Sequence, residues 1–195
     1  FMPNSPYAIS KAAAHWTTVN YAESYEMFAS NAILFNHESE IKDPEFVTRK
    51  ITMHVAKVSK GSDETLKLGD LSAMRDWGYA SEYVDCMYRI LQHDSADNFI
   101  VSTGIATSVR ELVEYSYDVI GLQLKWEGEG VDEKGLDSKS GRVLVEVDPR
   151  FFRINEINKQ TGNPGKAKRV LGWEAKMKVG DIARKMVEYD ISLLK

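Results

Sequence analysis

The first stretch of the chain has the hydrophobic pattern of a helix that leads into a buried strand. Ser5 followed by Pro6 is typical of a helix start, because a hydroxyl N-cap precedes a proline at the first helical position. Residues 7–28 are compatible with that helix. Residues 31–35 form a short apolar run, which is typical of a strand buried in a parallel sheet. We expect a polar loop over residues 36–45.

Beyond this loop, segments with helical spacing of apolar residues alternate with short apolar runs. Helices are predicted over residues 46–60, 81–92, 109–121 and 181–194, and a short one begins at Asn163-Pro164 and ends before Gly172. Ser108 and Glu111 fit a capping box at the start of the third of these. Strands are predicted over residues 65–68, 98–102, 122–126 and 143–147, with an exposed loop over 127–141.

This alternation of helices and strands indicates the α/β class. The first helix and strand have the pattern of one edge of a larger parallel sheet. The remaining segments have the pattern of a smaller mixed domain packed beside it.

The composition of the 195 residues narrows the class of protein. Hydrophobic residues at 43% and charged residues at 28% are globular values. A formal net charge of −4 without a long basic block argues against nucleic acid as the partner. No run approaches the roughly 20 apolar residues of a membrane span, and the single cysteine, Cys86, excludes an internal disulfide. We expect a cytoplasmic protein that binds neither nucleic acid nor membrane.

Tyr7 and Lys11 are the first candidates for chemistry. Side chains four residues apart on a helix lie on one face. An ammonium beside a phenol favours the phenolate, which lowers the tyrosine pKa from about 10 toward the range of proton exchange with a substrate. The chain contains nine tyrosines, so the spacing alone is a weak signal. The alternative is an ordinary tyrosine and lysine on a helix.

Polar side chains follow the predicted strand 31–35, where ligands bind in open α/β sheets. Asn36 and His37 are the candidates there, and the alternative is a capped polar loop. No second histidine lies at metal-ligand spacing from His37, so we expect no metal site.

A structured turn over residues 75–78 supplies an arginine. Arg75 could form a forked contact with phosphate, and Trp77 could form the wall of a pocket. The alternative is a solvated pair of Arg75 and Asp76, with Trp77 in the core.

A second arginine, Arg153, lies three residues before Glu156. Together with Asn36 and Arg75, these two side chains would suit a diphosphate that carries ribose hydroxyls. Taken singly, a surface ion pair is the alternative.

In this order and spacing, these segments closely resemble GDP-mannose 4,6-dehydratases, a family of the extended short-chain dehydrogenase/reductase superfamily. The similarity covers nearly the whole chain. The Tyr-x-x-x-Lys pair is shared by the superfamily, whereas Asn-His-Glu-Ser and Arg-Asp-Trp-Gly are far more specific. The segments that carry the resemblance are Ser5-Pro6-Tyr7 with Lys11, residues 33–39, 46–51, 69–70, 75–78, 108–111 and 147–153.

The resemblance implies an arrangement of domains. Residues 1–45 would be the C-terminal part of a Rossmann-type cofactor domain. Residues 46–195 would be mostly a smaller mixed α/β domain that binds the nucleotide sugar, with some segments returning to the Rossmann sheet. The family's Gly-x-x-Gly-x-x-Gly fingerprint and its catalytic threonine and glutamate lie upstream of the tyrosine. The resemblance therefore implies that this chain is the C-terminal portion of a dehydratase and is inactive alone.

The resemblance also implies a reaction and its residues. This would be a hydro-lyase of GDP-fucose biosynthesis, in which NADP takes hydride from C4 of GDP-mannose, water leaves across C5 and C6, and hydride returns to C6. Tyr7 would be the acid/base, assisted by Lys11. The cofactor residues would be Tyr7, Lys11, His37 and Lys42. The substrate residues would be Asn36, Val47, Lys50, Arg75, Arg153 and Glu156. A homo-oligomer, dimer or tetramer, is implied as well.

Two segments depart from the family pattern. Residues 40–43, Glu-Ile-Lys-Asp, replace the usual Pro-Arg-Arg-Gly. Lys42 keeps one of two positive charges, but a lysine does not reproduce an arginine fork. Because this loop reaches toward the cofactor and the neighbouring subunit in the family, we expect both contacts to differ here. Ile154 replaces the usual proline after Arg153.

Two other functions remain open at this point. One is another nucleotide-sugar epimerase or reductase of the same superfamily. The other is a truncated, non-catalytic protein that binds a nucleotide sugar. The coding sequence upstream of Phe1 discriminates between the enzyme and the truncated protein, because a glycine-rich βαβ unit there would favour the enzyme.

Overall fold

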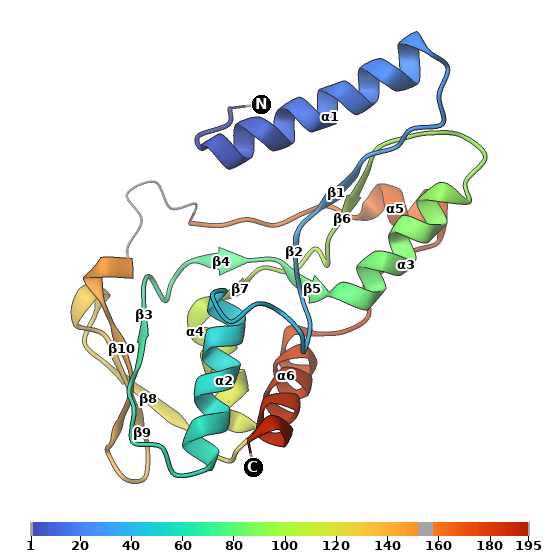
Figure 1. The fold of residues 1–195 in the computed structure, drawn as a ribbon. Helices are drawn as coiled ribbons and strands as arrows, with labels where there is room; N and C mark the ends of the chain where they lie inside the picture. The colour runs from blue at the N-terminus through green and yellow to red at the C-terminus, as the bar shows by residue number, and fades with distance from the viewer. Residues whose placement is uncertain (1, 152–157, 195) are drawn as a thin grey trace.

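The computed structural model describes residues 2–151 and 158–194, and it has the predicted α/β fold with parallel strands (Figure 1). Its helices are α1 (Pro6–Ser24), α2 (Val47–Ser59), α3 (Ala80–Leu91), α4 (Val109–Asp118), α5 (Gly165–Leu171) and α6 (Val179–Leu193), with short 3-10 turns η1 (Gly130–Asp132) and η2 (Pro149–Phe151). Its strands are β1 (Ala32–Leu34), β2 (Asn36–Glu38), β3 (Leu66–Leu68), β4 (Met74–Arg75), β5 (Trp77–Tyr79), β6 (Phe99–Val101), β7 (Thr107–Ser108), β8 (Leu124–Glu127), β9 (Lys134–Asp137) and β10 (Val143–Val147).

The strands form several small sheets. Strands β1 and β6 pair in parallel, and so do β2 and β5. A mixed sheet has the order β3-β10-β9-β8, in which only the β3–β10 pair is parallel. Strands β4 and β7 form a short antiparallel pair.

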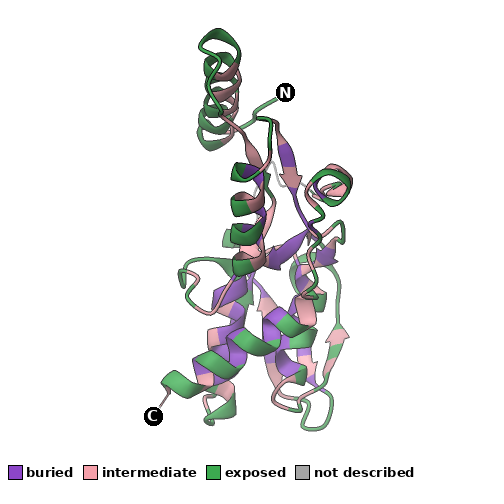
Figure 2. Cartoon of the chain, turned by 90° about the vertical axis from the view of Figure 1, so that its right-hand side faces the viewer, coloured by how far each residue is buried: buried purple, intermediate pink, exposed green. Residues whose placement is uncertain are grey.

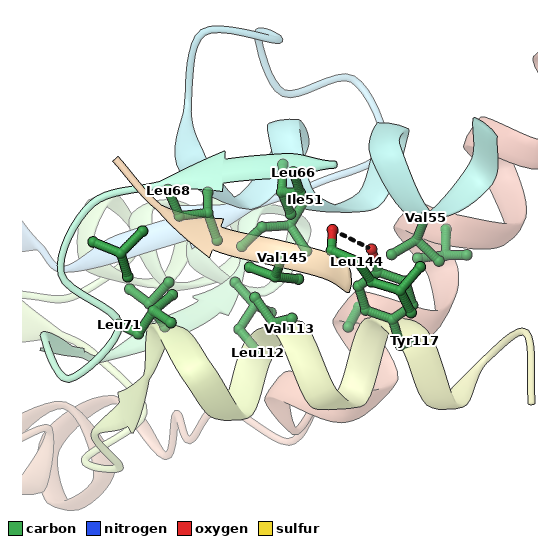
Figure 3. Packing of buried hydrophobic residues seen from close by; sticks show 14 of the residues in the cluster. Ile51, Val55, Leu66, Leu68, Leu71, Leu112, Val113, Tyr117, Leu144 and Val145 are labelled. Carbon is green, nitrogen blue, oxygen red and sulfur yellow. Dashed lines mark hydrogen bonds between the residues drawn. The ribbon is translucent and has the colours of Figure 1, made fainter. Parts of the chain in front are cut away.

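The larger hydrophobic core lies between the mixed sheet and helices α2, α4 and α6. Figure 3 shows Ile51 and Val55 of α2 on one side of this core and Val113 of α4 on the other. Each such side chain contributes about 1.5–3 kcal/mol when it leaves water. The Tyr117 hydroxyl also lies 3.4 Å from the carbonyl oxygen of Leu144. This core therefore ties three helices to one sheet.

A smaller core lies around β1, β6, α3 and α5. Its buried members are Tyr83, Cys86, Ile90, Phe99, Val101, Ala167 and Trp173. The indole N–H of Trp173 donates to the carbonyl oxygen of Glu82 at 3.0 Å, so the segment after α5 is fixed to the start of α3. The division of the chain at residue 45 stays a prediction.

Helix α1 lies at one end of the molecule, beyond β1 and β6, in both views (Figures 1 and 2). Ser5 caps it as predicted, because its hydroxyl oxygen accepts the Ala8 N–H at 3.1 Å. The helix buries none of its residues and ends at Ser24, four residues before the predicted end. Its link to β1 includes a hydrogen bond from the Asn31 amide to the His15 carbonyl at 3.4 Å.

Two predicted loops were wrong. Residues 36–38 form β2 and pair with β5, and residues 127–141 contain η1 and β9. Neither β2 nor β9 has an alternating apolar pattern. Pairing with a neighbouring strand, and not the strand's own side chains, therefore determines each of them. In β9, Gly135 pairs with Trp126, and a Cβ there would lie 2.8 Å from the indole ring. The glycine therefore makes room for the tryptophan.

In the described ranges, no helix is long and apolar enough to cross a membrane. The same ranges contain no cluster of three side chains suited to hold a metal ion.

Candidate active site

Residues predicted for the substrate lie where β1 ends and β2 begins. Strand β2 pairs in parallel with β5, and Asn36 is opposite Trp77. Because Arg75 ends β4, two residues before Trp77, the fold brings the Asn36 and Arg75 segments side by side although they are far apart in the sequence. The backbone segments of two predicted substrate residues are therefore neighbours, and their role as a site stays a prediction.

The backbone of β4 is held on both of its sides. Arg75 pairs with Thr107 of β7, and Met74 forms a bridge to Lys159. The guanidinium of Arg75 donates from Nη1 to the carbonyl oxygen of Met74 at 2.8 Å. Arg153 and Glu156 lie outside the described residues.

The alternative of a solvated Arg75–Asp76 pair is wrong. Asp76 is only 1% exposed, and its carboxylate accepts hydrogen bonds from Thr103 and from backbone amides. Trp77 does lie in the core, as that alternative required. The turn is therefore an internal joint of the fold.

His37 has a defined hydrogen-bonding pattern. Its Nδ1 lies 3.0 Å from the carbonyl oxygen of Phe35, which can only accept, so Nδ1 carries the proton. With the proton on Nδ1, the tautomer leaves Nε2 as the atom that can accept a hydrogen bond from a ligand. The ring lies at 42° to that of Tyr83, with centroids 5.4 Å apart.

Lys42 is bound to its own loop. Its ammonium donates to the carbonyl oxygen of His37 at 3.0 Å and lies 3.6 Å from Glu38 Oε1. It also lies 4.4 Å from the centre of the Phe46 ring. The only basic residue of the segment 40–43 thus supports the backbone beside His37.

Glu40 of the same segment also has partners in its own chain. The Tyr79 hydroxyl donates to both of its carboxylate oxygens at 3.1 Å, and Lys185 of α6 lies 3.3 Å from Oε1. The altered loop is therefore fixed to β5 and α6 of its own chain.

A buried polar network under this loop was not predicted from the sequence. The Thr48 hydroxyl donates to Glu38 Oε2 at 2.5 Å. Burial raises the pKa of Glu38, although Thr48 and Lys42 oppose this. Isolated polar residues give no sequence signal of burial, because the same residue types dominate surfaces.

The second part of the network is an ion pair between α2 and α6. Arg49 Nη2 lies 2.7 Å from Asp190 Oδ1, and both side chains are buried. The Thr52 hydroxyl donates to the other carboxylate oxygen at 2.7 Å. Arg49 also donates to the carbonyl oxygens of Glu40 and Lys42, which fixes the loop to α2.

Lys50 lies in a pocket of about 380 Å³ between α2, β3 and η2. Its ammonium donates to the Lys67 carbonyl at 2.8 Å and lies 4.1 Å from the centre of the Phe151 ring. Burial lowers the pKa of Lys50, while Asp148 and Glu45 act in the opposite direction. The pocket is lined by Pro44, Lys50, Met53, His54, Lys57, Glu64, Thr65, Leu66, Lys67, Arg150 and Phe151. Val47, the other residue predicted for this side, begins α2.

Tyr7 and Lys11 share one face of α1, as predicted. The Lys11 ammonium lies 5.5 Å from the centre of the Tyr7 ring. Tyr7 is 71% exposed, and α1 buries no residue, so the pair is not enclosed by the described part of the chain. The roles assigned to all of these residues stay predictions.

Comparison with known proteins places the chain in a family. A family model described as GDP-mannose 4,6 dehydratase matches residues 1–186. The chain is 51% identical over 194 residues to GDP-mannose 4,6 dehydratase 2 of Caenorhabditis elegans, covering 100% of this chain and 50% of the relative. It is 47% identical over 195 residues to GDP-mannose 4,6-dehydratase of Sinorhizobium fredii, with 100% and 56% covered. The chain thus spans about half the length of these curated relatives.

Solved structures agree on the fold. The protein RMD from Pseudomonas aeruginosa, complexed with NADPH, superposes with a TM-score of 0.81 at 21% identity, over 99% of this chain and 57% of that one. A dTDP-glucose 4,6-dehydratase from Bacillus anthracis, in complex with NAD, gives a TM-score of 0.75 at 20% identity, over 97% and 53%. At these identities the likeness shows the α/β fold alone. The family model covers 186 of the 195 residues, and relatives of the same description cover the whole chain, so this chain belongs to the GDP-mannose 4,6-dehydratase family.

Proposed function

We propose that this chain is part of a GDP-mannose 4,6-dehydratase, a hydro-lyase that converts GDP-mannose to GDP-4-dehydro-6-deoxy-mannose with NADP as its cofactor. The observation that carries the proposal is the similarity along the whole chain, at 51% and 47% identity, to two curated proteins of that name. Because the chain spans about half of each of them, the activity is assigned to the product of the complete reading frame that encodes it.

Tyr7 is the proton-transferring group in this proposal. Its phenolate, favoured by the Lys11 ammonium on the same helix face, would accept the proton of the C4 hydroxyl as that carbon is oxidised and would become the phenol. The cofactor, when bound, would serve as the acceptor of the C4 hydride and as its donor to C6.

The described residues fit one end of a dinucleotide. The phenol of Tyr7 and the ammonium of Lys11 can bond ribose hydroxyls, and His37 offers a ring nitrogen as an acceptor because its Nδ1–H is used by Phe35. Lys42 would act through the backbone of His37, to which its ammonium donates. The sequence contains no Gly-x-x-Gly-x-x-Gly segment for the pyrophosphate.

The substrate would lie between the Asn36–Arg75 region and the Lys50 pocket. An arginine beside an amide suits a diphosphate, because charge-assisted N–H donors bind phosphate oxygens strongly. The Lys50 pocket combines an aromatic ring, an aliphatic side chain and lysine ammonium groups, which suits a flat, polar nucleobase. Arg153 and Glu156 would hold the phosphate and the ribose.

The proposal extends to the setting of the enzyme, on the strength of the family resemblance. It includes a cytoplasmic location, a homo-oligomer that is a dimer or a tetramer, and a place in GDP-fucose biosynthesis. The altered segment 40–43 is bound to Tyr79 and Lys185 of its own chain, so its contacts to a neighbouring subunit would differ from those of an arginine-containing loop.

Turnover of purified protein from the complete reading frame tests this function. We expect GDP-mannose to lose one water and give a 4-keto, 6-deoxy sugar without net consumption of NADP. Inversion at C4 without loss of water, or net consumption of NADPH, would favour the epimerase or reductase alternative. Tight binding of GDP-mannose without any turnover would favour the non-catalytic one.

A further inference from the structure

Asp76 lies at a joint between three segments of the chain. Its Oδ1 accepts hydrogen bonds from the amide and the hydroxyl of Thr103 at 2.8 and 2.6 Å. Its Oδ2 accepts the N–H of Gly104 at 2.9 Å and that of Gly162 at 3.2 Å. Four donors from two separate loops thus converge on one buried carboxylate.

Those loops are packed too closely for other side chains. Thr103 and Gly104 follow β6, and Gly162 lies in the segment that leads to α5. A Cβ on Gly162 would lie 2.3 Å from Ser102 Oγ, and Gly104 has a φ of +79°, a conformation that favours glycine. The carboxylate therefore joins segments whose approach leaves little freedom to move.

The same segments hold the backbone that carries Arg75. The Met74 N–H donates to the carbonyl oxygen of Asn158 at 2.8 Å, and the Gln160 N–H donates to that of Met74 at 3.0 Å. Fixing Asp76 to its partners sets the direction in which the adjacent Arg75 side chain leaves the backbone. It also fixes the 158–162 segment against β4.

We propose that Asp76 is a positioning residue, which aims Arg75 at the diphosphate of the nucleotide substrate by holding the loops at Thr103 and Gly162 against the turn. This inference rests on the proposed function, because it takes Arg75 as a phosphate ligand. Asp76 itself is buried and satisfied by protein donors, so it acts through Arg75 and not on the substrate.

The chemistry of the joint requires a carboxylate. An asparagine has the same shape but replaces one acceptor oxygen with an NH₂ group, which would face an N–H donor of the loops. The turn and the loops would have to separate to relieve this conflict. Such a shift would displace Arg75, which lowers the affinity for the diphosphate even though the guanidinium itself is still present.

The test is Asp76→Asn in protein from the complete reading frame, with GDP-mannose KM, kcat and GDP binding by calorimetry as the measurements. We expect KM and the GDP Kd to rise about tenfold or more, as a misdirected charge-assisted contact would cause. The turnover number should change by less than about twofold, because the acid/base is elsewhere.

Asp137→Asn is the matched control. Asp137 also accepts backbone N–H groups, from Lys139 and Ser140 at 3.2 Å, but it lies in the β9–β10 hairpin. It should lower the melting temperature without raising KM. Equal effects of the two variants on KM would overturn the proposal, as would an unchanged KM and GDP Kd in Asp76→Asn.

A double-mutant cycle shows whether Asp76 acts through Arg75. On an Arg75→Ala background, Asp76→Asn should add less than about twofold to KM, because the aimed group is gone. A full additional rise would overturn the proposal.

Thr103→Val is the alternative if Asp76→Asn fails to fold. It removes one donor, keeps the carboxylate and should raise KM severalfold. An unchanged KM would again overturn the proposal. An inactive wild type that still binds GDP would reject the proposed function, while the GDP measurements would still decide the role of Asp76.

Discussion

Tyr7 carries the most direct prediction at the scale of single residues. In protein from the complete reading frame, Tyr7→Phe should lower kcat by about 10² to 10⁴, because it deletes the hydroxyl that transfers the proton but keeps the ring and the helix. The Kd for GDP-mannose should change little. Tyr21→Phe on the same helix serves as the control. A kcat equal to that of wild type would remove Tyr7 from the mechanism.

Arg75 is expected to act on binding instead. Arg75→Ala removes a charge-assisted phosphate contact worth roughly 1.5–3 kcal/mol, so calorimetry should show the Kd for GDP-mannose rising by about one to two orders of magnitude. Arg89→Ala is a matched control, because Arg89 pairs with Asp85 at 2.9 Å on the surface of α3. Equal affinities for wild type and Arg75→Ala would return Arg75 to a structural role.

The residues that sequence reasoning missed around this site are buried and charged or polar. Asp76, Glu38 and the Arg49–Asp190 pair make their contacts inside the protein. Burial depends on partners that are distant along the chain, as for Arg49 and Asp190, so composition and spacing could not reveal it. The apolar strand before Asn36 and His37 was recognisable and is present as β1, whereas their place at a ligand-binding edge stays a prediction.

At the scale of elements, helices with a strong apolar period were predicted to within a few residues. The helix predicted over 46–60 is Val47–Ser59, and the one over 181–194 is Val179–Leu193. The capping box is also present, since Ser108 accepts the Glu111 N–H at 3.1 Å and Glu111 accepts the Ser108 N–H at 2.7 Å. Strands β2, β4, β5, β7 and β9 were missed because they lack the apolar run or alternation that marked the equally short β1, β3 and β6.

His54 connects helix α2 to the loop before β3 and to α4, and it makes their packing sensitive to pH. Its Nε2–H donates to the carbonyl oxygen of Glu64 at 3.0 Å, and the Tyr117 hydroxyl of α4 donates to Nδ1 at 3.0 Å. Only the second contact requires the neutral ring, because a protonated Nδ1 cannot accept a hydrogen bond. Burial lowers the pKa of His54 below its usual value of about 6.5, although Glu64 acts in the opposite direction.

A histidine whose pKa is lowered by folding makes its full contribution to stability above its unfolded pKa. This contribution is lost as the pH falls from the unfolded pKa through the lower folded pKa. We therefore compare wild type with His54→Gln from about pH 7.5 to about pH 5.5, a range that brackets the usual histidine pKa of about 6.5. The free energy of unfolding should decrease more steeply in wild type as the pH falls. Urea titrations at each pH measure the difference. Burial raises the pKa values of Glu38 and Asp190, so these groups change the free energy of unfolding in the opposite direction as the pH falls. Both proteins contain them, and the comparison therefore cancels their contributions. Parallel curves for the two proteins would contradict this role for His54.

At the scale of the whole molecule, the two ends of the described structure differ in how much they bury. Helices α2, α4 and α6 close a continuous core on the mixed sheet, whereas α1 buries no residue and β1 pairs only with β6 in its sheet (Figure 2). The large apolar side chains exposed on and after α1 are Tyr7, Ile9, Trp16, Tyr21, Tyr25, Met27 and Phe28. Exposed apolar groups and open strand edges favour association.

Residues 1–195 expressed alone should therefore associate and should neither bind NADP measurably nor dehydrate GDP-mannose. Lys11, His37 and Lys42 can contact only part of the cofactor, and no Gly-x-x-Gly-x-x-Gly segment of this sequence can bind its pyrophosphate. The core around α2, α4 and α6 should still give a cooperative thermal transition, because its packing does not involve α1. Sedimentation and an NADP titration followed by fluorescence measure both properties, with protein from the complete reading frame as the control. Micromolar NADP binding by a monodisperse monomer of residues 1–195 would show that these residues form a complete cofactor site.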